Sequence, residues 1–203
     1  MRTAWRTKNC GSKARRELRC AQRLRALRFA AAVLLGPLAV GAEAAPAGGD
    51  IGTGKVSGLP VPRFVSLKTD RVNLREGPSK DHRTAWVFQR AGLPVEIVAE
   101  FETWRRIRDA EGTEGWVLHS LLSGRRTALV APWTKDAVPV PLYERADERA
   151  ETVAKLQPNV IASVKQCTGA WCRITVAQPN ARDLDGYIRQ DRLWGVYPNE
   201  RVE

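Results

Sequence analysis

The feature that most constrains the fold of this chain is an internal repeat within residues 63–198. Short segments rich in β-branched and aromatic residues occur there twice, in the same order, and only the loop lengths between them differ. The paired segments are Val72–Leu74 with Val140–Leu142, Pro94–Val98 with Pro158–Val164, Trp104–Ile107 with Trp171–Ile174, and Gly115–Val117 with Gly186–Ile188. Because a series repeated in order marks two copies of one structural unit, the sequence predicts a tandem pair of small domains.

Each copy consists of short apolar runs separated by turn signals, which is typical of a small barrel or sandwich rather than of a helical or α/β domain. We therefore predict an all-β protein, with a first domain at residues 63–126 and a second at residues 137–198. Between them, residues 127–136 form a predicted ordered linker, and its part Thr127–Trp133 is apolar and contains a Trp. This segment is expected to be ordered, either as a linker or as the last strand of the first copy.

Residues 1–44 are predicted to be a secretory signal peptide. A basic region is followed by the apolar run Phe29–Val40 and by Ala42–Ala44, which has the small-x-small pattern that signal peptidase recognises. The run has twelve residues, whereas a membrane span needs roughly 17 to 25. We therefore expect cleavage after Ala44, no stable membrane anchor afterwards, and a periplasmic or secreted protein. Residues 45–62 are rich in Gly and Pro and lack periodicity, which predicts a flexible leader.

The formal net charge of +11 suggests a nucleic-acid partner, because clustered Lys and Arg neutralise phosphates. The distribution of the charge argues against it. Residues 1–44 contain ten basic and two acidic residues, so the rest of the chain carries 23 basic and 20 acidic residues and a net charge of only +3. We therefore expect no nucleic-acid binding by the mature chain.

Cys167 and Cys172 are the only cysteines that follow the predicted cleavage site. They flank four residues at the tip of a predicted hairpin, so pairing of the two strands would bring them face to face. An oxidising compartment favours a disulfide there, and closing so short a loop contributes roughly 2 kcal/mol. We favour a structural disulfide over two alternatives. A zinc site needs four ligands, and the only imidazoles, those of His82 and His119, lie in the other copy. A redox pair has two intervening residues, whereas four separate these cysteines.

Several of these segments resemble the bacterial SH3-like domains of exported proteins, in the tandem form common in alphaproteobacteria. The segments that carry the resemblance are Val72–Ser79, Trp104–Ile107, Glu114–Val117, Ser120–Arg126, Cys167–Cys172, Gly186–Ile188 and Leu193–Tyr197. The resemblance implies two tandem small SH3-like barrels that serve mainly for attachment, in some members to cell-wall peptide or glycan. The second copy has Tyr143–Ala146 where the first has Arg75–Pro78, so a ligand site formed by that turn is less expected in the second copy.

Five residues are candidates for ligand binding: Arg75, Trp86, Trp104, Trp116 and Trp194. Arg75 begins a tight turn and is a candidate for the lining of a groove, although the turn alone explains the local sequence. Trp104 and Trp116 lie on predicted strands, where alternation directs them into the core, and the alternative is a shelf on which a sugar ring or a peptide stacks. Trp86 and Trp194 lie in less regular contexts and are expected on an exposed or inter-domain surface.

The sequence contains no recognisable catalytic constellation. A cysteine nucleophile needs a free thiol beside a His base, and neither a Gly-x-Ser-x-Gly elbow nor a phosphate-binding loop is present. We therefore predict a non-catalytic periplasmic binding module, without cofactor or metal, that docks on peptidoglycan or on a cell-wall-associated protein. The alternative is a structural or regulatory protein–protein interaction partner of an exported enzyme or sensor.

Overall fold

The computed structural model describes residues 52–203, which belong to a single compact unit. The predicted signal peptide and the first residues of the predicted leader lie outside the described residues. The regular structure within residues 52–203 consists of β-strands and of two 3-10 turns, η1 (His119–Leu121) and η2 (Gln190–Arg192). In this part of the chain, no helix has the length and apolar character required to cross a membrane.

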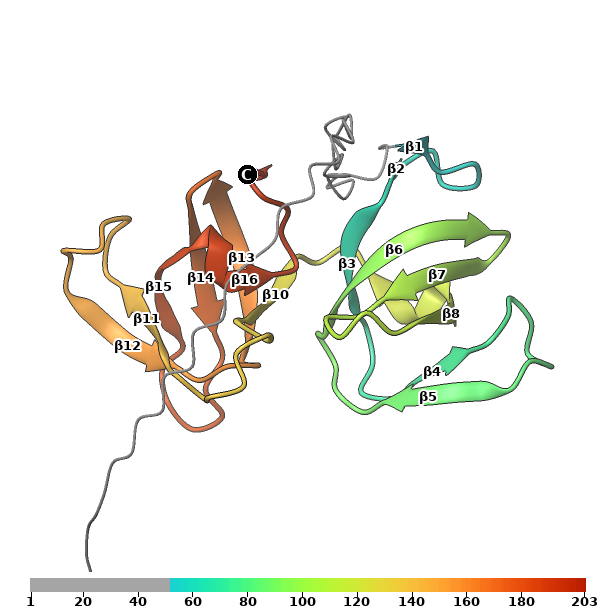
Figure 1. The fold of residues 1–203 in the computed structure, drawn as a ribbon, viewed down its shortest axis with the longest axis horizontal. Helices are drawn as coiled ribbons and strands as arrows, with labels where there is room; N and C mark the ends of the chain where they lie inside the picture. The colour runs from blue at the N-terminus through green and yellow to red at the C-terminus, as the bar shows by residue number, and fades with distance from the viewer. Residues whose placement is uncertain (1–51) are drawn as a thin grey trace, which may run out of the picture. The chain divides into compact units, whose positions relative to one another are not determined.

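The first copy of the repeat forms an antiparallel seven-stranded sheet in the order β5-β4-β8-β7-β6-β3-β9. Its strands are β3 (Arg63–Leu67), β4 (Val72–Arg75), β5 (Thr84–Phe88), β6 (Pro94–Phe101), β7 (Trp104–Arg108), β8 (Glu114–Leu118) and β9 (Leu122–Ser123). The turn η1 connects β8 to β9. These strands appear in cyan to yellow-green in Figure 1.

The second copy repeats this topology, in the order β12-β11-β15-β14-β13-β10-β16. Its strands are β10 (Thr127–Val130), β11 (Val140–Tyr143), β12 (Thr152–Leu156), β13 (Ile161–Thr168), β14 (Trp171–Val176), β15 (Leu184–Arg189) and β16 (Leu193–Trp194), with β17 (Arg201–Val202) paired to β13. Each strand takes the place of the strand seven positions earlier (Figure 1, yellow to red). The expected all-β class and the expected tandem pair of small barrels are confirmed.

The segment that we expected to be a linker, residues 127–136, begins with a strand of the second barrel. Thr127–Val130 pairs with β13 on one side and with β16 on the other, so it belongs neither to a linker nor to the first copy. All four residues of this strand are buried. A strand that is covered on both faces has no polar alternation, and for this reason the segment resembled an apolar connection in the sequence.

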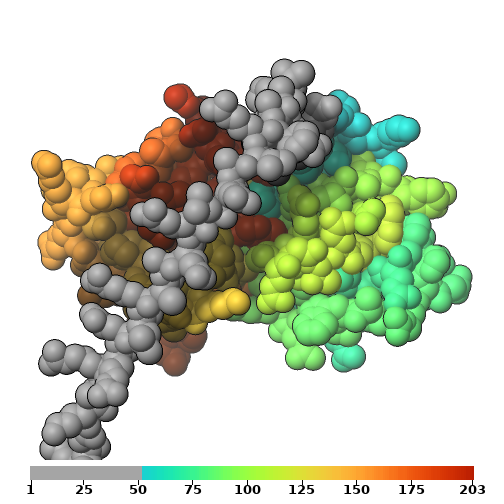
Figure 2. Space-filling model, in the orientation of Figure 1, coloured from blue at the N-terminus to red at the C-terminus, as the bar shows by residue number. Residues whose placement is uncertain are grey.

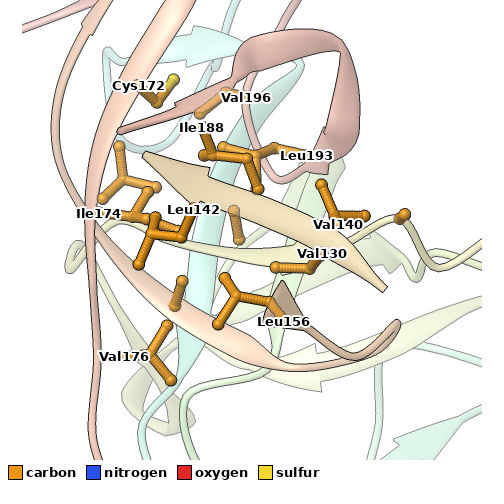
Figure 3. Packing of buried hydrophobic residues seen from close by; sticks show 14 of the residues in the cluster. Val130, Val140, Leu142, Leu156, Cys172, Ile174, Val176, Ile188, Leu193 and Val196 are labelled. Carbon is orange, nitrogen blue, oxygen red and sulfur yellow. The ribbon is translucent and has the colours of Figure 1, made fainter. Parts of the chain in front are cut away.

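The core of the second barrel is built from inward-facing residues of nearly every strand. The largest of its fully buried side chains include Leu142, Ile174 and Ile188, which point toward one another in Figure 3. Cys167 on β13 and Cys172 on β14 are register partners and form a disulfide, with 4.1 Å between their Cα atoms. The predicted disulfide is therefore confirmed, and it closes one end of this core.

One glycine in each copy explains the repeated Gly-aromatic motif. A Cβ on Gly115 of β8 would lie 2.9 Å from the carbonyl oxygen of Arg75, and a Cβ on Gly186 of β15 would lie 2.7 Å from that of Tyr143. At these positions β8 and β15 pass close to β4 and β11, respectively. Glycine is required because any side chain would push the paired strands apart.

The predicted flexible leader is wrong for residues 52–62. They form a small hairpin of β1 (Gly52–Thr53) and β2 (Pro60–Val61). The Glu100 carboxylate holds its loop, since it accepts hydrogen bonds from the Ser57 backbone N–H (2.9 Å) and from the Ser57 hydroxyl (2.6 Å). Arg63 and Arg105 form ion pairs with the same carboxylate at 2.8 and 3.4 Å. A single long-range carboxylate therefore orders a segment whose Gly- and Pro-rich composition indicated flexibility.

Candidate ligand-binding site

Two of the five candidate residues, Arg75 and Trp104, lie together in a pocket on the outer face of the first barrel. The pocket has a volume of about 280 Å³. Its lining consists of Arg71, Asn73, Arg75, Lys80, Trp104, Leu118 and Leu121. The β4–β5 hairpin, which contributes one wall, stands at the surface of the barrel in the space-filling view (Figure 2). We call this site the basic pocket.

Strand alternation places these side chains on the outer face. On β4, Val72 and Leu74 are fully buried in the core, so that Asn73 and Arg75 point outward. Trp104 on β7 is the register partner of Leu118 on β8, and both residues line the pocket. The Trp104 side chain is itself only 7% exposed. It therefore lines the pocket while most of its surface is buried. Its use as a shelf on which a ligand stacks stays a prediction.

The position of the Arg75 guanidinium is fixed by the loop that follows β4. Its Nη1 donates hydrogen bonds to the carbonyl oxygens of Lys80 (2.9 Å) and His82 (2.7 Å). An ion pair between Arg83 and Glu76 closes the base of the same loop. These contacts bring Lys80 beside Arg75, although five residues separate them in the sequence.

The basic pocket is strongly positive. Arg71, Arg75 and Lys80 line it, and its lining contains no acidic residue. Within residues 52–203, none of these three side chains takes part in an ion pair, although eleven such pairs occur elsewhere. Guanidinium and ammonium groups bind carboxylates and phosphates by charge-assisted hydrogen bonds. The Trp104 indole offers an apolar surface beside them, a combination suited to a small organic anion.

Trp116 lies on the same face as the basic pocket but does not line it. Its neighbours Gly115 and Val117 face the core, so its indole points outward. Alternation in the sequence had instead directed Trp116 into the core. The indole packs edge-to-face on Phe101, with 6.5 Å between ring centroids. Trp116 thus extends the apolar surface of this face beyond the pocket.

Trp86 and Trp194 lie in two other places. Trp86 on β5 is 59% exposed and borders a groove of about 290 Å³ that also includes Leu129 and Pro132 of the second copy. Trp194 on β16 contacts Phe64 of the first barrel, with 5.0 Å between ring centroids. The structure therefore separates the five candidates into three locations.

Sequence reasoning missed Arg71 and Lys80 in the basic pocket. Arg71 was within reach, because residues 71, 73 and 75 alternate with the apolar residues Val72 and Leu74. Lys80 was not, because the hydrogen bonds of Arg75 to the loop backbone decide its position.

The bacterial SH3 domain family matches this chain twice, over residues 68–124 and 136–195. The chain belongs to the bacterial SH3 domain family. The resemblance found in the sequence is thus confirmed for both copies, and membership in this family indicates a binding module.

No curated protein matches the chain. The solved structures that are similar to it include NlpC2 and NlpC1 from Trichomonas vaginalis, each with a TM-score of 0.29. Their sequences are 14% and 15% identical to it, and each alignment covers 66% of this chain. The chain spans about half the length of these proteins, 48% of NlpC2 and 45% of NlpC1.

The second SH3 domain has a hollow at the equivalent position, with a volume of about 340 Å³. Tyr143 on β11 stands there in place of Arg75, and Arg189 on β15 in place of Leu118. Arg189 forms ion pairs with Glu148 (3.4 Å) and Asp191 (3.2 Å) and lies over the Trp171 ring. The turn-dependent site expected mainly in the first copy therefore has a counterpart, but its two arginines, Arg189 and Arg192, already form ion pairs.

Within residues 52–203, no three His, Cys, Asp or Glu side chains are grouped so as to hold a metal ion. His82 lies in the loop beside the basic pocket, and His119 begins η1.

Proposed function

We propose that this protein is an exported, non-catalytic binding module that docks on peptidoglycan through the basic pocket of its first SH3 domain. The observation that carries the proposal is the grouping of three cationic side chains around the Trp104 indole, without an acidic residue in the lining. Membership in the bacterial SH3 domain family supports a binding role. The signal peptide predicted for residues 1–44 supports export.

Peptidoglycan presents the chemistry that this pocket fits. Its stem peptides end in carboxylates, and the Arg75 guanidinium offers a planar fork that matches a carboxylate. With a volume of about 280 Å³, the pocket admits one short peptide end rather than a whole glycan strand. Arg71 and Lys80 are exposed, so their attraction is screened by salt. We therefore expect weak, salt-sensitive binding that a polymer with many peptide ends strengthens by avidity.

The lining also supports a non-catalytic role. It consists of arginine, lysine, asparagine, tryptophan and leucine side chains. None of these types serves as a nucleophile paired with a general base at neutral pH unless a neighbouring group activates it. The chemistry available in the basic pocket is therefore recognition of an anion.

The test is co-sedimentation of Ala45–Glu203 with purified peptidoglycan sacculi at physiological salt. The variant Arg71→Gln with Lys80→Gln removes two pocket charges, and within residues 52–203 neither side chain makes an ion pair or a hydrogen bond. The control Lys55→Gln with Lys155→Gln removes the same charge from exposed positions away from the pocket. We expect the pocket variant to bind about five- to tenfold more weakly, from about 0.5 kcal/mol or more per exposed charge contact.

The control variant is expected to bind like the wild type. An equal loss in both variants would mean non-specific attraction to an acidic polymer, and the pocket would then have no special role. If the wild type failed to sediment with sacculi, the peptidoglycan proposal would be abandoned in favour of an exported protein partner.

A further inference from the structure

A second cavity lies where the two SH3 domains meet, away from the basic pocket. Its volume is about 770 Å³, within the range of about 300 to 1,000 Å³ that is usual for small-ligand sites. The first domain contributes Phe64 and Arg108 to its lining, and the second contributes Trp194 and Tyr197. Trp133, in the segment between β10 and β11, also borders it. We call this site the junction cleft.

The wall of the junction cleft is held by contacts between the domains. The Phe64 ring packs on Trp194 and on Tyr197, with centroid distances of 5.0 and 4.7 Å. The Tyr197 hydroxyl donates a hydrogen bond of 2.8 Å to Oε1 of Glu96, and Arg108 donates to Oε2 of the same carboxylate at 2.6 Å. Because burial and the hydrogen bond to Glu96 raise the pKa of Tyr197, the phenol remains a donor at all ordinary pH values. The cleft is thus preformed.

Trp133 differs from the other aromatic residues of the cleft. Its side chain is 52% exposed, and within residues 52–203 it stacks on no other aromatic ring. The rings of Phe64, Trp194 and Tyr197 are engaged with one another. Trp133 therefore presents a free indole face at the edge of a cavity, which is the arrangement that stacks against a flat, partly apolar ligand.

Four of the five charged side chains that line the junction cleft form ion pairs, in contrast to the cations of the basic pocket. Arg108 pairs with Glu96, and Arg189 pairs with Asp191 at 3.2 Å. The Asp109 carboxylate accepts hydrogen bonds from two backbone N–H groups of its own turn, at 2.8 and 3.0 Å. The lining therefore offers planar hydrogen-bonding groups, three carboxylates and two guanidinium groups, and their net charge of −1 disfavours an anionic ligand.

We propose that the junction cleft binds a neutral saccharide, with one pyranose ring against the Trp133 indole and its hydroxyl groups toward Asp109, Arg189 and Asp191. A sugar ring has an apolar C–H face and a polar rim, and the cleft combines an exposed indole with paired polar groups in the same way. The site is separate from the basic pocket and binds its ligand whether or not the protein docks on peptide ends.

The test uses a defined probe, the tetramer of β-1,4-linked N-acetylglucosamine, titrated into Ala45–Glu203 by calorimetry and by NMR of the indole N–H signals. We expect saturable binding that shifts the Trp133 signal, and a Trp133→Ala variant that binds about tenfold more weakly. The matched control is Trp86→Ala, which removes an equally exposed indole from the other groove and should bind like the wild type.

The outcomes separate this inference from the proposed function. The variant Arg71→Gln with Lys80→Gln is expected to keep full affinity for the tetramer even when it no longer sediments with sacculi. The inference is overturned if the wild type shows no saturable binding, if Trp133→Ala binds as tightly as the wild type, or if Trp86→Ala loses as much affinity.

Discussion

The Glu100 carboxylate allows a quantitative test of how the N-terminal hairpin is held. Its side chain is 1% exposed, and it accepts hydrogen bonds from Ser57 and forms ion pairs with Arg63 and Arg105. The substitution Glu100→Gln keeps the shape of the side chain but removes its charge and one acceptor oxygen. The two arginines then lose their common partner, and the loop around Ser57 loses a hydrogen bond.

The size of the effect follows from the pKa of this carboxyl group. Burial alone raises the pKa of Glu100, but hydrogen bonds from Ser57 and Arg63 and the charge of Arg105 outweigh burial and lower the pKa from 4.5 to about 2. A carboxylate with a depressed pKa stabilises the folded state above its unfolded pKa. That stabilisation, about 3 kcal/mol at most, is lost as the pH falls from 4.5 through 2.

The assay is urea unfolding of Ala45–Glu203 and its Glu100→Gln variant between pH 7 and pH 2.5, together with limited proteolysis of residues 52–62. At pH 7 the variant should be less stable by about 1 to 3 kcal/mol and should be cut faster in this segment. The difference should shrink as the pH falls, because the wild type loses its carboxylate. Glu111→Gln, at an exposed carboxylate without an ion pair in residues 52–203, should change neither quantity. A stability difference that is independent of pH would refute the assigned role.

Two further predictions concern the barrels. Gly186→Ala should destabilise the protein by about 2 kcal/mol in urea unfolding, because the new Cβ would meet the Tyr143 carbonyl oxygen. The control Gly124→Ala, where no atom lies within 4 Å of the new Cβ, should have little effect. Equal effects of the two substitutions would contradict the close approach of β15 to β11. Tyr197→Phe should lower the free energy of unfolding by about 1 to 2 kcal/mol, because the buried Glu96 carboxylate loses a hydrogen-bond donor. If this variant were as stable as the wild type, the hydrogen bond between the domains would not contribute to stability.

The topology was predictable because the repeat carries it. Each pair of repeated segments corresponds to a strand in both barrels. Gly115 and Gly186 occupy equivalent positions because the same close approach of two strands occurs in both barrels. The role of Thr127–Val130 was not predictable from periodicity. Periodicity identifies strands that have one wet face, and this strand is covered on both faces.

The N-terminal hairpin was not predictable for a different reason. Its Gly and Pro content indicates that the segment is flexible on its own, and that inference does not hold once a tertiary contact orders the segment. The partner is Glu100, more than forty residues away in the sequence, and a charged residue near the end of a strand gives no sign that it will be buried. Long-range polar contacts of this kind become visible only when the tertiary structure is known.

The candidate sites were predictable in their residue types but not in their grouping. Arg75 and Trp104 were chosen for separate reasons, and only the barrel brings them together over the same pocket. Trp86 and Trp194 were both expected on an exposed or inter-domain surface, and the structure places them at two different cavities. The junction cleft depends on how two domains pack, for which neither copy carries a local signal.

The duplication has a consequence for the proposed function, because the two copies have not kept the same chemistry at the same place. The first domain has Arg75 and Leu118 where the second has Tyr143 and Arg189. The cations of the first pocket form no ion pair within residues 52–203, whereas both arginines of the second hollow are paired with acidic side chains. Two identical weak sites would increase affinity for any polymer with repeated carboxylates. Two different sites, held by the contacts of Phe64 and Glu96 with the second domain, instead favour a polymer that carries unlike groups at a fixed spacing. Glycan strands with attached peptides are such a polymer, so under the proposed function we expect divergence of the copies to act on selectivity more than on affinity.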